Sequence, residues 1–119
     1  MTGPTHTAIN NCLNAISAEI KDASKVVKIG DKYQAAEILG NQFVTRKTRL
    51  TFNSYSYENE LSKDGIVIGG TPYCMCYPAS KRLDQWEFDV ALIDEAAQMS
   101  IPLSVAIMSK TDRFIFVGD

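Results

Sequence analysis

The chain has 119 residues, of which 45% are hydrophobic, and a formal net charge of −2. This length suits one globular domain with its own core. No apolar run reaches the roughly 18 residues that span a membrane, and the N-terminus, MTGPTHTAIN, lacks the basic start and apolar stretch of a signal peptide. A membrane anchor and secretion are therefore not expected, and we expect a cytoplasmic protein, or a nuclear one if the source is eukaryotic.

The charge is distributed unevenly along the chain. Basic side chains gather in residues 21–50 and acidic side chains in residues 81–119. On charge alone, the basic part is interpreted as an ordinary solvated face.

The cysteines do not form a recognisable metal or redox motif. They are Cys12, Cys74 and Cys76, an odd number, and Cys74-x-Cys76 is tighter than the usual C-x-x-C spacing. His6 is the single histidine, so a structural zinc site would lack ligands. We expect free thiols.

The first predicted element is an amphipathic helix that begins after Thr5. Its apolar stripe is Ile9, Leu13, Ile16 and Ile20, with Cys12 beside it, and its opposite, polar stripe is Asn10, Asn14, Ser17 and Lys21. Threonine favours the N-cap position, since its hydroxyl accepts a hydrogen bond from the first helical turn. Thr5 is therefore the predicted cap.

Short apolar segments that predict strands follow, with helical segments between them. A β-branched piece, KVVKIG (25–30), precedes a short helix in YQAAEILGNQF (33–43), and residues 43–60 are interpreted as irregular or weakly β. Buried strands are predicted at GIVIGGT (65–71), FDVALI (88–93) and RFIFV (113–117), with a helix from Pro102 to Ser109 between the last two. Apolar strands that alternate with helices indicate an α/β fold, a parallel sheet with flanking helices.

The predicted strands end in small, hydroxyl or acidic residues, which would gather at one rim of a parallel sheet. These residues are Gly30, Thr71, the pair Asp94 and Glu95, and the pair Gly118 and Asp119. Open α/β sheets bind ligands at this rim.

The paired carboxylates have two interpretations. Asp94 could cap the next turn with Glu95 solvated beside it. Alternatively, one carboxylate holds a cation while the other handles a proton, as nucleotide hydrolysis requires: an aspartate orients hydrated Mg²⁺ on the phosphates of ATP, and a glutamate activates the attacking water. Gln98 would then be placed to sense the phosphates.

The segment ALIDEAAQMSIP, followed about twenty residues later by FIFVGD, resembles motifs II and III of superfamily 1 helicases, especially the branch that contains the nonsense-mediated-decay helicase. GPTHTAINNCL is similar to motif Ia of that branch, and VIGGTPY occupies the place of its next nucleic-acid-contacting motif. The resemblance covers nearly the whole chain in order. It implies a RecA-like motor domain that couples ATP hydrolysis to movement along single-stranded DNA or RNA.

The resemblance also implies roles for individual residues. Asp94 would be the Mg²⁺ ligand and Glu95 the catalytic carboxylate. Gln98, Gly118 and Asp119 would link the nucleotide to the strand-binding surface, while Pro4, Thr5 and His6, with Thr71 and Pro72, would touch the nucleic-acid backbone. Simpler roles stay open for two of them: His6 as a solvated residue of the first helical turn, and Thr71 as the cap of a turn before Pro72.

The sequence departs from the family in lacking a G-x-x-x-x-G-K-[ST] phosphate loop. In the family this loop lies upstream of motif Ia, and the second RecA-like domain with its arginine finger lies downstream of motif III. We therefore expect residues 1–119 to be a partial RecA-like domain, a fragment of a larger helicase without the phosphate-loop strand and without ATPase activity of its own. The missing remainder of the helicase would be one partner.

Without that strand, RFIFV would have one unpaired edge and would tend to pair with another chain. Two alternatives remain open. One is a non-catalytic α/β module that binds nucleic acid or a protein. The other is a small metal-dependent hydrolase built on Asp94 and Glu95, which the lack of other clustered metal ligands disfavours.

Overall fold

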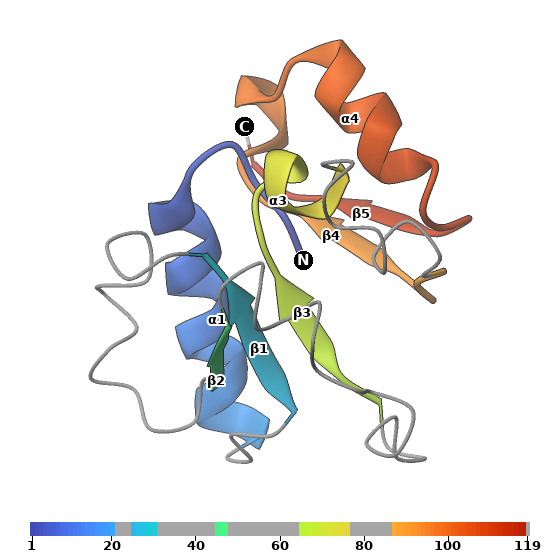
Figure 1. Ribbon diagram of the computed structural model, residues 1–119. Helices are drawn as coiled ribbons and strands as arrows, with labels where there is room; N and C mark the ends of the chain where they lie inside the picture. Colours follow the sequence, from blue (N-terminus) through green and yellow to red (C-terminus); the bar gives the residue numbers. More distant parts are fainter. Residues whose placement is uncertain (21–24, 31–44, 48–64, 77–86, 119) are drawn as a thin grey trace.

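Short parallel strands and flanking helices make up the computed structural model, which describes residues 1–20, 25–30, 45–47, 65–76 and 87–118 (Figure 1). The elements are α1 (His6–Ile20), β1 (Val26–Ile29), β2 (Thr45–Lys47), β3 (Val67–Gly69), α3 (Pro72–Cys76), β4 (Ala91–Ile93), the 3₁₀ helix η4 (Ala96–Gln98), α4 (Ile101–Met108) and β5 (Phe114–Phe116). The helix predicted at 33–43, most of 43–60, and Asp119 lie outside the described residues.

Every described strand pairing is parallel, which confirms the predicted parallel α/β character. The strands form one group in the order β2-β1-β3 and a second group, β4-β5. The N-terminal residues join the two groups: Thr2 forms a parallel bridge with Ile93, and the main chain of Met1 bonds to Ile68 and Gly70. The N-terminus therefore lies between β3 and β4 (Figure 1).

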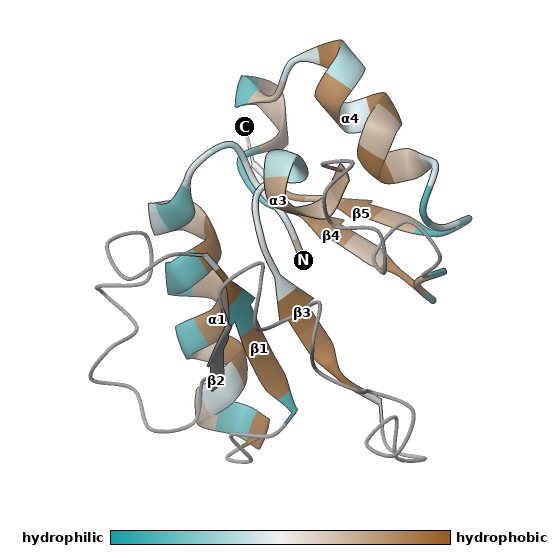
Figure 2. Ribbon diagram, viewed as in Figure 1, coloured by the Kyte–Doolittle hydropathy of each residue, from teal (hydrophilic) through white to brown (hydrophobic). Residues whose placement is uncertain are grey.

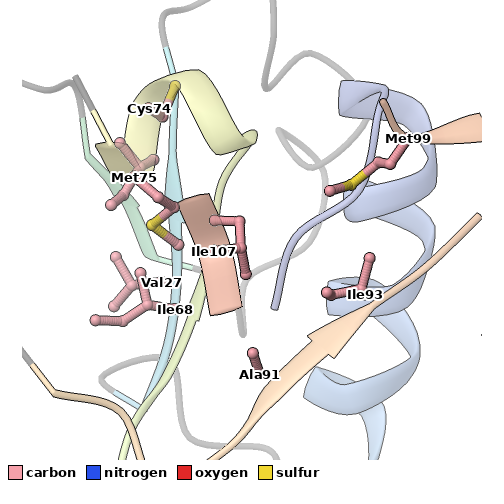
Figure 3. Close-up of a cluster of buried hydrophobic side chains, with 9 residues drawn as sticks. Val27, Ile68, Cys74, Met75, Ala91, Ile93, Met99 and Ile107 are labelled. Carbon is pink, nitrogen blue, oxygen red and sulfur yellow. The ribbon is translucent and has the colours of Figure 1, made fainter. Parts of the chain in front are cut away.

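The apolar core has two parts, because alternate residues of a strand face opposite sides of the sheet. The larger part lies where α3 and α4 cover the strands, and Figure 3 shows most of its members: Val27, Ile29, Ile68, Cys74, Met75, Ala91, Ile93, Met99 and Ile107. The smaller part joins Ile9 and Leu13 of α1 to Val26 of β1. Hydrophobic residues accordingly run along β3 and β4, while α1 is of mixed character (Figure 2).

Helix α1 begins as predicted, and its predicted apolar stripe is confirmed in part: Ile9 and Leu13 are buried. The Ala8 N–H donates to Thr5 Oγ1 at 3.2 Å, which confirms the cap. Asn10 and Ser17, expected on the polar stripe, are buried, whereas Ile20 is exposed. Leu13 packs closely against the bare backbone of Gly69, and the buried Ser17 hydroxyl donates to the Asn14 carbonyl at 2.9 Å.

The strands are shorter than the apolar runs that predicted them. The segment 88–93 forms a ladder only from Ala91; before that, the Phe88 N–H donates to the Lys110 carbonyl. The run 65–71 ends at Gly69, and α3, which was not predicted, begins at Pro72. The helix predicted at 102–109 is confirmed with a shift of one residue.

Strand β5 lies at the edge of the β4-β5 group. It pairs with β4, and within the described part of the chain no strand covers its other side. Ile115 and Phe116 are 49% and 52% exposed. Self-association along this edge stays a prediction.

Two further findings concern the chain as a whole. All three cysteines are free thiols. No helix in the described ranges has the length and apolar character that crossing a membrane would require.

Candidate functional site

The carboxyl ends of the parallel strands bring most of the predicted site residues to one rim. Asp94 and Glu95 directly follow β4, Gly118 follows β5, and Gly3 follows the bridge at Thr2. The Asp94 N–H donates to the Thr2 carbonyl at 2.9 Å. A Cβ placed on Gly3 would lie 3.1 Å from the Asp94 carbonyl oxygen. The backbone of Gly3 therefore packs closely against the backbone of Asp94.

The turn after β4 holds the two carboxylates in a constrained geometry. Asp94 Oδ1 accepts the Glu95 N–H at 3.0 Å. Glu95 has φ 50° and ψ 43°, the left-handed conformation that is uncommon for residues other than glycine. Both side chains are half-buried.

The turn packs directly against the residues that follow β5. The Ala96 N–H donates to the Val117 carbonyl at 3.0 Å. Gly118 has φ 126°, and a Cβ there would lie 3.2 Å from Glu95 Cα. Glycine is therefore needed at 118 both for its conformation and for this close approach.

Gln98 belongs to the same turn as Asp94 and Glu95. The Gln98 N–H donates to the Glu95 carbonyl at 3.0 Å, and the residue is exposed at the end of η4. Asp119 lies outside the described residues.

The start of α1 lies beside this acidic turn. Pro4 and His6 are half-buried and Thr5 is exposed. Burial, and next the charge of Asp94, raise the pKa of the Cys12 thiol, which puts the carboxylate within electrostatic reach of α1. The segment that leads into Pro4, Thr5 and His6 thus lies against the acidic turn, through Thr2 and Gly3.

Lys28 is a residue of this region that the sequence interpretation missed. It was counted with the solvated basic side chains, and that interpretation is wrong for Lys28, which has 0% of its surface exposed. Its Nζ lies 3.0 Å from His6 Nδ1. Because an ammonium only donates hydrogen bonds, a protonated Lys28 makes Nδ1 the acceptor and puts the His6 proton on Nε2.

Burial is also the main influence on the charge of Lys28. Desolvation lowers its pKa to about 8, and the Cys74 thiol opposes this shift. A signal was available in the sequence: a lysine in the middle of the apolar strand VVKI must either point to solvent or find a partner.

Thr71 and Pro72 lie at the start of α3, away from solvent. Thr71 is 7% exposed, and its Oγ1 accepts the Cys74 N–H at 3.4 Å. Pro72 is fully buried. This geometry supports the capping role of Thr71, while a contact of either residue with a nucleic acid stays a prediction.

The donor set for a cation at the rim is small. No group of three or more His, Cys, Asp or Glu side chains that could hold a metal occurs among the described residues. A hydrated Mg²⁺ needs only one or two carboxylates when phosphates and water complete its shell. Asp94 therefore fits a Mg²⁺ that binds together with ATP, and it does not fit a metal held by protein ligands alone.

Comparison with known proteins finds no family model that matches the chain and no curated protein that is similar to it.

Proposed function

We propose that the chain is part of a RecA-like motor domain of superfamily 1 helicase type and supplies the metal-binding and water-activating carboxylates of its ATPase site. The observation that carries the proposal is the shared rim, where Asp94 and Glu95 leave β4 between Gly3 and Gly118. A motor has to connect nucleotide hydrolysis to strand movement. In this chain Thr2 and Gly3, which directly precede Pro4, Thr5 and His6, contact the main chain of Asp94.

In this proposal the two carboxylates have separate roles. Asp94 would hold a hydrated Mg²⁺, which supplies charge neutralisation at the phosphates of ATP when it is bound. Glu95 would orient a water molecule and accept its proton. Gln98 and Gly118, which both contact the main chain of Glu95, would respond to the γ-phosphate.

The phosphates of ATP also need a cradle that the sequence does not contain. Phosphate loops supply it with consecutive backbone N–H groups and a lysine, and no such motif occurs in the 119 residues. Hydrolysis would therefore depend on a phosphate loop from another polypeptide segment.

The proposed single-strand path begins at the N-terminus of α1. Free N–H groups at a helix N-terminus attract phosphate, and Pro4, Thr5 and His6 form this end of the helix. The buried Lys28 ammonium lies 3.0 Å from His6 Nδ1 and adds a positive charge next to this end of the helix. Contacts of this kind read the backbone and not the bases, which agrees with a net charge of only −2.

The proposal predicts weak, sequence-independent binding of single strands. Fluorescence anisotropy with labelled single-stranded DNA and RNA, at one fixed low salt concentration, should give saturable binding. His6→Ala should weaken it about fivefold, the equivalent of one hydrogen bond of about 1 kcal/mol. Asn11→Ala is the control because Asn11 is exposed on the same helix.

Each outcome decides between functions. If neither nucleic acid binds, or if the two variants bind equally well, the strand path is wrong and a non-catalytic protein-binding module becomes the better interpretation. With Mg²⁺ and ATP, no phosphate release is expected from the wild type. Release that Glu95→Gln abolishes would show that the chain has a phosphate cradle of its own, against the proposal.

A further inference from the structure

The side chain of Lys28 extends from β1 on the side of the sheet that α1 covers. Alternate residues of a strand face opposite sides of the sheet. Val27 and Ile29 belong to the main core, whereas Val26 packs against α1, and Figure 1 shows α1 lying along β1. Lys28 follows Val26 by two residues and therefore shares its side, where it is fully buried and its Nζ reaches His6 at the start of the helix.

The hydrogen bond between Lys28 and His6 fixes the state of the imidazole ring. An ammonium donates hydrogen bonds and accepts none, so His6 Nδ1, 3.0 Å from Lys28 Nζ, is the acceptor, and the ring proton is on Nε2. Protonation of both ring nitrogens would set an N–H against the ammonium and place two positive charges together in a desolvated site, which is unfavourable. Burial lowers the pKa of Lys28 to about 8, so its amino group is still mostly protonated at pH 7.

The position of the ring proton decides how His6 interacts with a phosphate. A neutral imidazole has one N–H donor and one bare nitrogen, and the hydrogen bond made by one nitrogen determines which of the two carries the proton. With the proton on Nε2, this nitrogen is a donor for a phosphate oxygen. In the other tautomer Nε2 would present a lone pair to the same oxygen. Lys28 therefore selects the tautomer in which Nε2 attracts phosphate.

Lys28 also lies near the second segment that was predicted to touch the strand. Besides desolvation, which lowers the pKa of Lys28, the Cys74 thiol acts on it in the opposite direction. The Cys74 N–H donates to Thr71 Oγ1 in the first turn of α3. One buried positive charge is therefore within electrostatic reach of both segments of the proposed strand path.

We propose that Lys28 is a positioning residue of this strand path: its ammonium holds His6 as a neutral imidazole with the proton on Nε2, and this N–H donates to a backbone phosphate of single-stranded nucleic acid. The inference rests on the proposed function. Lys28 itself does not touch the phosphate, because the residue is fully buried and its amino group is bonded to Nδ1. Its role resembles that of the outer partners that fix the tautomer and orientation of histidines at metal sites.

Nitrogen-15 NMR of the imidazole ring tests the positioning without any nucleic acid. His6 is the single histidine of the chain, so the signals of its two ring nitrogens are unambiguous. At pH 7 the wild type should show a neutral ring with the proton on Nε2. Lys28→Met should shift the ring signals toward the mixture of tautomers and imidazolium that an unrestrained histidine shows near this pH. Lys25→Met, which removes a positive charge three positions earlier, is the control and should leave the ring signals unchanged.

Anisotropy titrations with labelled single-stranded DNA, at one fixed low salt concentration, then test the phosphate contact. Lys28→Met should weaken binding about fivefold, as expected for His6→Ala, and Lys25→Met should bind like the wild type. Because Lys28 acts through His6, the double variant His6→Ala/Lys28→Met should also lose only about fivefold. Additive losses, about 25-fold in the double variant, would show that Lys28 acts as an independent charge and would overturn the inference.

The two experiments separate the failure of this inference from the failure of the proposed function. If the wild type binds no single strand, the proposed function fails and the phosphate contact fails with it. If the wild type binds but its ring proton lies on Nδ1, or if Lys28→Met leaves the ring signals or the affinity unchanged, the strand path stands and the positioning role of Lys28 is wrong.

Discussion

Glu95 occupies a backbone conformation that costs free energy. A left-handed residue with a Cβ is less stable than glycine by roughly 1–2 kcal/mol, and Glu95 adopts it while Gly118 packs against its Cα. Such strain persists where the surroundings fix the backbone, and it is frequent at functional sites. Under the proposed function, this strain would be the cost of holding the Glu95 carboxylate at the rim.

Replacing Glu95 by glycine should stabilise the fold. Glu95→Gly relieves the left-handed strain and should raise the free energy of unfolding by about 1 kcal/mol, measured by urea denaturation with circular dichroism. Glu95→Ala is the control because it removes the carboxylate but keeps the Cβ, and it should give no such gain. Equal stabilities of the two variants would show that the backbone at 95 is not strained.

Some features of the rim could be predicted from the sequence and others could not. Asp94 and Glu95 could be placed from the sequence because they follow an apolar run directly, and strand ends of a parallel sheet meet at one edge. The contact of Lys28 with His6 could not be predicted in the same way. It joins residues 22 positions apart and depends on how α1 crosses β1, which no local pattern specifies.

At the scale of elements, apolar runs predicted which segments form strands but not where the ladders begin. The residues of a run such as 88–93 are apolar because they are buried. The hydrogen-bonded ladder begins only at Ala91, because its start depends on where β5 can pair. The face of α1 was predicted only in part for a related reason. Hydrophobic periodicity predicted the burial of Ile9 and Leu13. It did not predict the burial of Asn10 and Ser17, because that depends on the surfaces that pack against the helix, such as the notch at Gly69 that receives Leu13.

The notch at Gly69 makes a prediction for the packing of α1 on β3. A Cβ at position 69 would lie 2.5 Å from Leu13 Cδ1, and Leu13 is fully buried, so Gly69→Ala should destabilise the protein by about 1–3 kcal/mol through overpacking. Gly70→Ala is the matched control because its Cβ would meet only ordinary contacts at 3.5 Å or more. Urea denaturation of both variants measures the difference, and a Gly69→Ala variant as stable as Gly70→Ala would refute the close packing of Leu13 on Gly69.

At the scale of the whole molecule, two buried amino groups oppose folding. The Met1 ammonium donates to the Ile68 carbonyl. The Lys28 side chain extends from β1 to His6 at the start of α1. Burial lowers the pKa of the first from 8.0 to about 6 and of the second from 10.5 to about 8. Between its folded and unfolded pKa values, each group binds fewer protons in the folded state, so the free energy of unfolding rises with pH.

The stability of the protein should therefore rise in two steps, from pH 6 to 8 because of Met1 and above pH 8 because of Lys28. Below about pH 6 both groups are charged in both states, and the full cost of burial is present. Above pH 9 the Cys12 thiol acts in the opposite direction, because burial and Asp94 raise its pKa. Met1 and Lys28 are the amino groups of the described residues whose pKa burial lowers into the window from pH 6 to 9.

Lys28→Met separates the two steps. Methionine fills a similar volume without a charge, so the variant should be more stable than the wild type at pH 7, by on the order of 2 kcal/mol. It should keep the rise from pH 6 to 8 and lose the rise from pH 8 to 9. Lys25→Met, three positions earlier, is the control and should keep both steps. Urea denaturation across this pH range measures the stability of all three proteins.

A Lys28→Met variant whose stability still rises between pH 8 and 9 would show that Lys28 does not oppose folding through its charge. A wild type whose stability is flat from pH 6 to 8 would show that the Met1 ammonium does not oppose folding either.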